Sequence, residues 1–133
     1  MLKKLFGVLA VSCCFLAFTA TGFAQSPVTI TEMTVCKGIQ DREPVDAGDV
    51  FPNDIGKVYC FTRVSALETT SIKHVWYLEG EKRAELTFTV GASPSWRTSS
   101  SKIIRPVDSG NWKIEVLGPD GEILKTAEFT VEK

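Results

Sequence analysis

The 133-residue sequence predicts an all-β protein: an antiparallel immunoglobulin-like β-sandwich of about seven strands that follows a cleaved signal peptide. Three observations lead to this prediction. Short runs of β-branched and aromatic residues recur between clusters of Gly, Pro, Asn and Asp. No segment after residue 24 has a sustained helical period. The first residues combine a basic start with an apolar run. A small β-barrel is the alternative fold for the same strand pattern.

Residues 1–24 have the pattern of a secretory signal peptide. Two lysines precede the uncharged, almost wholly apolar run from Leu5 to Phe18, and Gly22-Phe23-Ala24 supplies small residues at a cleavage site. We expect cleavage after this run, which leaves residues 25–133 as one domain in the periplasm or outside the cell. Two alternatives stay open, lipidation at Cys13 and an uncleaved anchor, and contact with a membrane is expected only through them.

The domain without its signal is weakly acidic and has two cysteines. Its formal charge is −3 instead of −1, because the signal carries two lysines and no acidic residue. Nucleic-acid binding needs a concentrated positive field, so no nucleic-acid partner is expected. Cys36 and Cys60 remain after cleavage, and two cysteines in an oxidising compartment most often pair. The predicted disulfide would close a loop of about 25 residues and stabilise the fold by roughly 3.5 kcal/mol.

The first expected strand is Val28 to Val35, a run rich in threonine and branched residues. Its alternation shifts between Ile30 and Met33, which predicts a β-bulge. Residues 37–56 are charged and interrupted by glycines and prolines, so we expect a long connecting loop there. Phe51 is expected to anchor this loop to the core, and the length of the loop indicates that it is functional or covers one end of the domain.

The later strands are expected as short runs separated by turns. They are predicted at residues 58–64, 72–78, 83–90, 111–116 and 123–131. Trp76 and Trp112 fall on the inward faces of two of these strands, so both are expected in the core. The remaining segment, Trp96 to Lys102, is predicted as a hydroxyl-rich strand or strand edge.

The segment from Trp96 to Lys102 is the strongest candidate for a recognition surface, because it combines an indole, a guanidinium, four hydroxyls and an ammonium. The candidate binding residues are His74, Trp96, Arg97, Ser99, Ser101 and Lys102. Such an edge suits an extended peptide, an envelope protein or a glycan that stacks on the indole. A purely structural role for the same segment stays open. So does a position for His74 at the core edge, hydrogen-bonded to a backbone carbonyl or a serine.

The sequence predicts a non-enzymatic binding or interaction module without a cofactor or a metal. His74 is the only histidine, and no Gly-x-Ser-x-Gly motif accompanies the serines, so a hydrolase is a remote alternative. A purely structural envelope domain is the nearer alternative. Asp46, Asp49 and Asp54 share one expected loop, but their spacing matches no calcium loop.

Several motifs resemble the bacterial family called domain of unknown function 2914. The more specific ones are His74-Val75-Trp76-Tyr77 and Trp96-Arg97-Thr98-Ser99-Ser100-Ser101-Lys102. The resemblance extends over about residues 28–131, with Ser99 at a position where the family motif has an aromatic residue. The family has no established activity, so the resemblance implies an exported β-domain of the accessory kind and implies no reaction.

Overall fold

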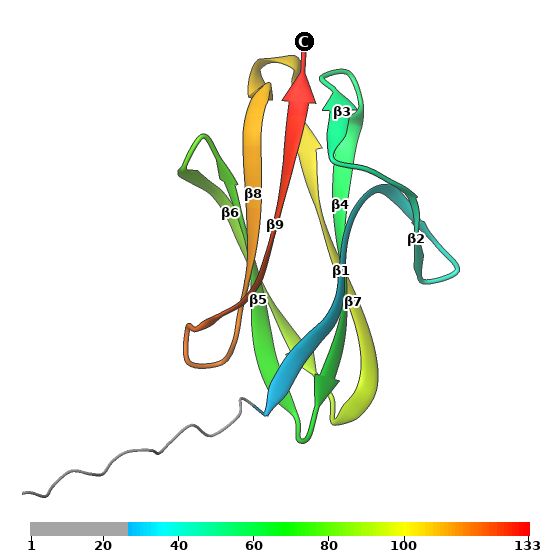
Figure 1. The fold of residues 1–133 in the computed structure, drawn as a ribbon, viewed down its shortest axis with the longest axis vertical. Helices are drawn as coiled ribbons and strands as arrows, with labels where there is room; N and C mark the ends of the chain where they lie inside the picture. The colour runs from blue at the N-terminus through cyan, green and yellow to red at the C-terminus, as the bar shows by residue number, and fades with distance from the viewer. Residues whose placement is uncertain (1–26) are drawn as a thin grey trace, which may run out of the picture.

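The computed structural model describes residues 27–133, which form two β-sheets packed face to face (Figure 1). The expected signal peptide and its cleavage site lie outside the described residues. The strands are β1 (Val28–Gln40), β2 (Glu43–Ala47), β3 (Val50–Pro52), β4 (Gly56–Ala66), β5 (Thr70–Leu78), β6 (Glu81–Val90), β7 (Ser93–Ile104), β8 (Gly110–Leu117) and β9 (Ile123–Glu132). A short 3-10 helix, η1 (Pro106–Asp108), precedes β8. Within this described part, no helix is long and apolar enough to cross a membrane.

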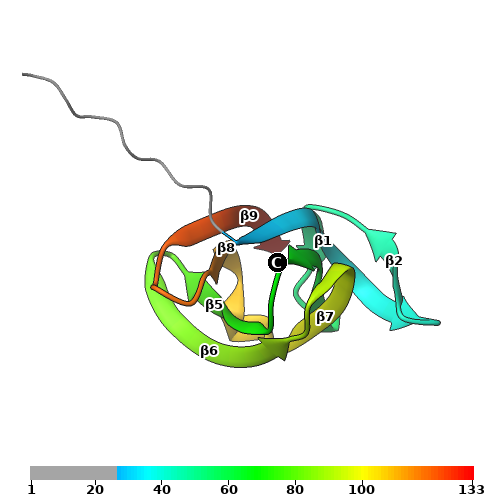
Figure 2. The same cartoon turned by 90° about the horizontal axis from the view of Figure 1, so that it is seen from below.

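The two sheets have the strand orders β2-β1-β4-β7, here called sheet A, and β3-β9-β8-β5-β6, here called sheet B. All pairs are antiparallel except β3 with β9. Figure 2 shows the two curved layers from one end, with β6 and β7 as neighbouring edges. Strands β1-β4-β7 facing β9-β8-β5-β6 correspond to the two sheets of an immunoglobulin-like sandwich, which confirms the predicted fold class.

The expected long loop at residues 37–56 is instead mostly strand. β1 runs on and turns back into β2 through Asp41 and Arg42, whose φ angles of 52° and 64° match a tight hairpin turn. Pro44 lies on β2, an edge strand, where a missing N–H is tolerated. The charged residues and the proline of this segment are typical of loops, so the sequence pattern did not indicate these strands. Phe51, at 1% exposed, is the core anchor that was predicted.

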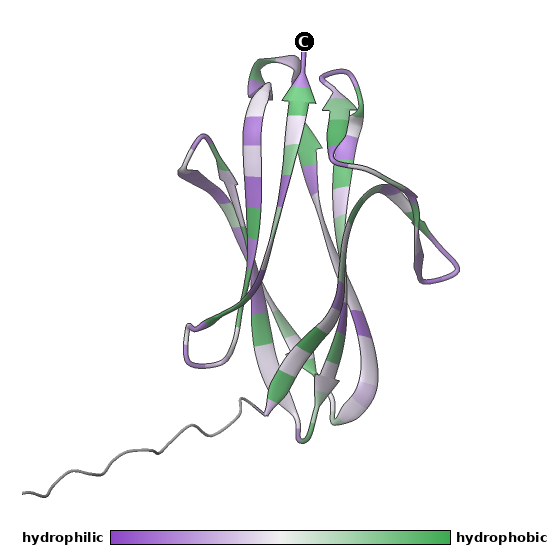
Figure 3. Ribbon diagram, viewed as in Figure 1, coloured by the Kyte–Doolittle hydropathy of each residue, from purple (hydrophilic) through white to green (hydrophobic). Residues whose placement is uncertain are grey.

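The core is built around three aromatic rings from sheet B. Trp112 stacks on Phe129 with ring centroids 5.7 Å apart, and Trp76 meets both edge-on at 6.4 and 6.1 Å. Both tryptophans are buried, as predicted. Hydrophobic and hydrophilic residues alternate along β8 and β9 (Figure 3), because each strand has one face in the core. The predicted bulge in β1 is confirmed by a register shift between Ile30 and Glu32.

Candidate functional site

The predicted recognition residues on β7 are divided between the two faces of sheet A. Opposed residues of an antiparallel pair share a face, so the register with β4 decides the side of each one. Arg97, Ser99 and Ser101 oppose Arg63, Phe61 and Tyr59 and lie on the outer face. Trp96 and Lys102 oppose the buried Val64 and Val58 and therefore have inward parity. Trp96 is 40% exposed and its ring lies over Gly91.

His74 is completely buried, so the structure does not bring it to the surface with the other candidates. Its Nδ1 lies 2.7 Å from Ser100 Oγ and its Nε2 lies 3.1 Å from Thr62 Oγ1. Ser100 Oγ also accepts a hydrogen bond from Trp76 Nε1 at 3.1 Å, and Thr62 Oγ1 donates to Thr98 O at 3.4 Å. We call these five residues the buried polar network. It connects β5 of sheet B to β4 and β7 of sheet A.

Burial keeps His74 neutral within the buried polar network. Burial lowers the pKa of His74 to about 4, because the charged imidazolium would lose its hydration there. With Nε2–H donating to Thr62 and Nδ1 accepting from Ser100, each hydroxyl donates once and every ring nitrogen is satisfied. A serine is therefore a hydrogen-bond partner of His74, which was one of the two partners predicted for this histidine. The identity of this serine, Ser100, was missed, although a period of two places it opposite in parity to Ser99 and Ser101.

The β1–β2 hairpin is tied to the outer face of sheet A by ion pairs. Glu43 Oε2 accepts from Arg97 Nη1 at 2.5 Å, and Glu43 Oε1 accepts from Arg63 Nη2 at 2.9 Å. Arg63 Nε also donates to Glu32 Oε1 at 3.1 Å. The hydrogen bonds from Arg97 and then Arg63 hold the pKa of Glu43 below its ordinary value. Arg97 is thus one half of a contact between segments that are 54 residues apart.

A groove opens where this hairpin meets β7. Its lining residues are Ile39, Arg42, Phe61, Arg97, Thr98 and Ser99, and we call it the arginine groove. Its volume is about 150 Å³. Phe61 is 1% exposed although it opposes Ser99 on the outer face, and the Arg63 guanidinium lies 5.4 Å from its ring centroid. Two of the lining residues, Arg97 and Ser99, are among the binding residues predicted from the sequence. Arg42 is not, because the sequence pattern places it in a loop.

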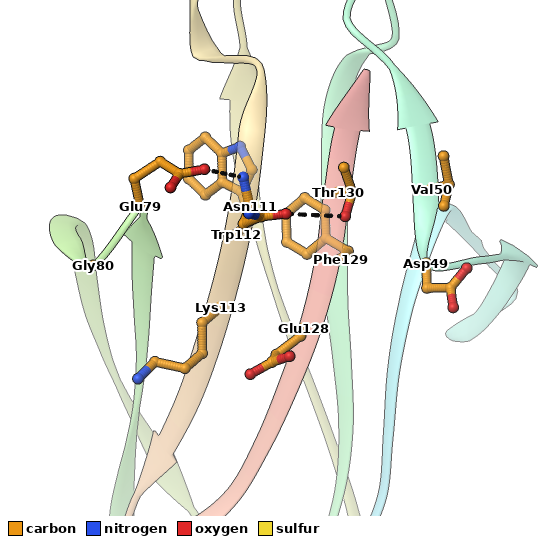
Figure 4. Close-up of a pocket in the computed structure, with 10 residues that line it drawn as sticks. All are labelled: Asp49, Val50, Glu79, Gly80, Asn111, Trp112, Lys113, Glu128, Phe129 and Thr130. Atoms are coloured by element: carbon orange, nitrogen blue, oxygen red, sulfur yellow. Dashed lines mark hydrogen bonds between the residues drawn. The ribbon is translucent and has the colours of Figure 1, made fainter.

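A larger hollow of about 590 Å³ lies on the outer face of sheet B (Figure 4). Asp49, Glu79, Asn111, Lys113, Glu128 and Thr130 supply its polar groups. Asn111 N donates to Glu79 Oε2 at 2.7 Å and Thr130 Oγ1 donates to Asn111 Oδ1 at 3.4 Å, so part of this wall satisfies itself. Between residues 27 and 133, no three His, Cys, Asp or Glu side chains are grouped to hold a metal ion.

The predicted disulfide between Cys36 and Cys60 is not formed, because the strand register separates the two side chains. Cys60 opposes Val35 and Cys36 opposes Tyr59, so the cysteines project from opposite faces of sheet A. Both are buried free thiols, and Cys36 Sγ donates to Gly38 O at 3.2 Å. Burial raises the pKa of Cys60 to about 12, so this thiol is unreactive in the folded state.

Both thiols are expected to be alkylated by iodoacetamide when residues 25–133 are denatured without reductant, and Cys60 is expected to be protected in the native protein. The reason is that the register leaves no bond between them and the core excludes the reagent. Mass spectrometry counts the added groups. A denatured, unreduced protein that takes up no label would contradict the register of β1 and β4.

Comparison with known proteins gives one family and no function. Residues 69–131, which hold β5 to β9, match the family described as Protein of unknown function (DUF2914). No curated protein matches. Among solved structures, a β-glucosidase from Kluyveromyces marxianus in complex with glucose has a TM-score of 0.46 at 11% identity, covering 80% of this chain and 14% of that chain.

A GH3 β-glucosidase from Bifidobacterium adolescentis has a TM-score of 0.44 at 11% identity, covering 78% of this chain and 17% of that chain. The chain therefore spans less than a fifth of either enzyme. The family match begins at residue 69, later than the residue 28 expected from the motifs. Over residues 69–131, the chain matches the DUF2914 family of proteins of unknown function, which supports the resemblance that its motifs indicated.

Proposed function

We propose that the protein is a non-enzymatic binding module, exported to the periplasm, whose arginine groove takes a carboxylate of a partner molecule. The signal pattern of residues 1–24 supports export. The observation that carries the binding proposal is the convergence of Arg42 and Arg97 on one groove with the Phe61 ring and the Ser99 hydroxyl.

The chemistry of the arginine groove favours a carboxylate. Guanidinium groups bind carboxylates through paired hydrogen bonds, and the half-buried Ile39 supplies an apolar side chain to the same groove. Arg97 uses Nη1 for Glu43, and Arg42 makes no ion pair with any described residue. Arg42 lies at the turn of the β1–β2 hairpin, and its left-handed backbone fits that turn.

The size of the groove favours a macromolecular partner. Pockets for drug-sized ligands have volumes of about 300–1,000 Å³. At about 150 Å³, the arginine groove has room for one side-chain-sized group. A carboxylate presented by a larger molecule therefore fits better than a free metabolite. The buried, doubly hydrogen-bonded His74 supports binding in place of proton transfer, because its ring nitrogens are occupied within the core.

Phenylacetate is expected to bind the groove at least about ten times more tightly than phenylacetamide, which lacks only the charge. Dissociation constants on the order of 1–10 mM are expected for so small a ligand. Titration followed by amide NMR shifts should move the signals of Phe61, Thr98 and Ser99. Arg42→Ala should weaken phenylacetate binding about fivefold or more.

Lys125→Ala is the matched control, because it removes one exposed positive charge from β9, outside the groove. It should leave phenylacetate binding unchanged. Equal binding of phenylacetate and phenylacetamide, or equal effects of the two variants, would show that the groove is not a carboxylate site.

A purely structural envelope domain is the second candidate, and the Glu43–Arg97 ion pair favours it. In that case the arginines only latch the β1–β2 hairpin to sheet A. Phenylacetate would then fail to bind.

A further inference from the structure

We propose that the partner supplies an extended polypeptide segment that pairs with the open edge of β7 and directs its acidic side chains to the arginine groove. This inference rests on the proposed function and adds the kind of partner and the way it docks. It depends on three features: the edge of β7, the half-covered inner face of β6, and the charges of β7.

The edge of β7 is open along its middle. β7 is the last strand of sheet A, and no strand among residues 27–133 pairs with its far side. Pro94 and Lys102 bracket the stretch between them. Proline cannot donate to a strand ladder, and a charged residue of inward parity discourages pairing. The segment available for pairing is therefore Ser95 to Ser101, long enough for an added strand of typical length.

The inner face of β6 is incompletely covered next to this edge. Leu86 and Phe88 pack against the core clusters, yet both are only half-buried. β6 and β7 are the neighbouring edges of the two sheets (Figure 2). A strand added to β7 would extend sheet A over β6, and its inward side chains would remove these apolar groups from water.

The charges of β7 indicate which kind of strand pairs with its open edge. Arg97 and Lys102 are the only charged residues between Ser93 and Ile104, and both are positive. A second β7 strand would bring another Arg97 and another Lys102 to this edge and no acidic residue to balance them, which disfavours a second copy of this chain. Pairing with an acidic strand is favoured instead, because a carboxylate opposite Arg97 lies beside the arginine groove and attracts its positive charges.

The test uses the peptide acetyl-Thr-Glu-Val-Glu-Val-Glu-Thr-amide and its matched version with Gln in place of Glu. Period two puts the acids on one face and the valines on the other. The Glu peptide is expected to bind at least about tenfold more tightly in an NMR titration. It should also slow amide hydrogen exchange within residues 95–101. Arg42→Ala should reduce the preference for Glu over Gln, and Lys125→Ala should not.

Two further peptides isolate the strand pairing without altering the protein. One carries N-methyl groups on its three Glu residues, and the other carries them on its two Thr and two Val residues. In an added strand only alternate N–H groups face β7, so one of these peptides should lose binding by about tenfold or more while the other keeps it.

The outcomes separate the two proposals. If both N-methyl peptides bind as tightly as the parent, or if the parent does not bind, strand addition is wrong, and phenylacetate binding still decides the groove. If the Glu and Gln peptides bind equally and phenylacetate does not bind, the carboxylate site fails, and the proposed partner fails with it. Sedimentation that shows a dimer abolished by the Glu peptide would identify a second copy as the natural occupant and overturn the choice of an acidic partner.

Discussion

Asp108→Ala is expected to lower the free energy of unfolding by about 2–3 kcal/mol, since it removes a buried carboxylate that accepts four charge-assisted hydrogen bonds. Asp108 is 2% exposed. Its Oδ2 accepts from the backbone N of Arg105 at 2.9 Å and from Arg105 Nε at 3.0 Å. Its Oδ1 accepts from Arg105 Nη2 at 3.0 Å and from Arg83 Nη2 at 2.9 Å. The loss stays below that of a fully buried ion pair, because the Arg105 side chain is 61% exposed and can be rehydrated.

The contacts of Asp108 join elements that the sequence leaves far apart. Arg83 comes from β6, whereas Asp108 ends η1 between β7 and β8. The carbonyl of Asp108 accepts from Trp112 Nε1 at 2.9 Å, and the Arg83 guanidinium lies 5.7 Å from a Trp112 ring centroid. The carboxylate therefore fixes one end of the sandwich against the aromatic core. The hydrogen bond from Arg105 is the main reason why the pKa of Asp108 is well below its ordinary value.

The control for Asp108→Ala is Glu85→Gln, which breaks the exposed ion pairs to Lys73 and Lys82. Exposed pairs of this kind contribute less than about 1 kcal/mol. Urea denaturation of both variants gives the two changes in free energy. A loss for Asp108→Ala no larger than that of Glu85→Gln would contradict the structural importance of this carboxylate.

The second prediction concerns acid. As the pH falls from about 6.5 to about 4, the protein is expected to lose roughly 3 kcal/mol of stability through His74 alone. The folded-state pKa of about 4 is below the ordinary value of 6.5, so in this window the unfolded chain binds a proton that the folded chain does not. The stability from neutral His74 is therefore complete above pH 6.5 and decreases as the pH falls towards 4.

Urea denaturation at several pH values measures this dependence. His74 is the only histidine of the sequence, so His74→Gln should flatten the slope between pH 6.5 and pH 4.5 even if it lowers the overall stability. The lowered pKa values of Glu43 and Glu85 act at lower pH, because their contributions decrease only below their ordinary value of 4.5. The same slope in the wild type and in His74→Gln would show that His74 is not held neutral by burial.

The sequence by itself determined the fold class, the two core tryptophans, the bulge in β1 and the anchoring role of Phe51. All of these follow from local properties. Alternation with a period of two is imposed by the geometry of one extended chain, and large apolar residues at inward parity have only the core to fill. For the same reason residues 96–102 were predicted as a strand or strand edge, whereas the list of candidate binding residues grouped side chains from both faces of that strand.

The tertiary structure decided what depends on the register between strands. The register of β4 with β1 and with β7 separated Cys36 from Cys60 and placed Ser100 inside with His74. The folding of the β1–β2 hairpin brought Arg42 and Glu43 to Arg97, although nothing in a charged, proline-containing segment indicates a partner more than 50 residues away. Such contacts depend on which strands pair and in what register, and these are properties of the packed sandwich that the sequence pattern of a single strand does not carry.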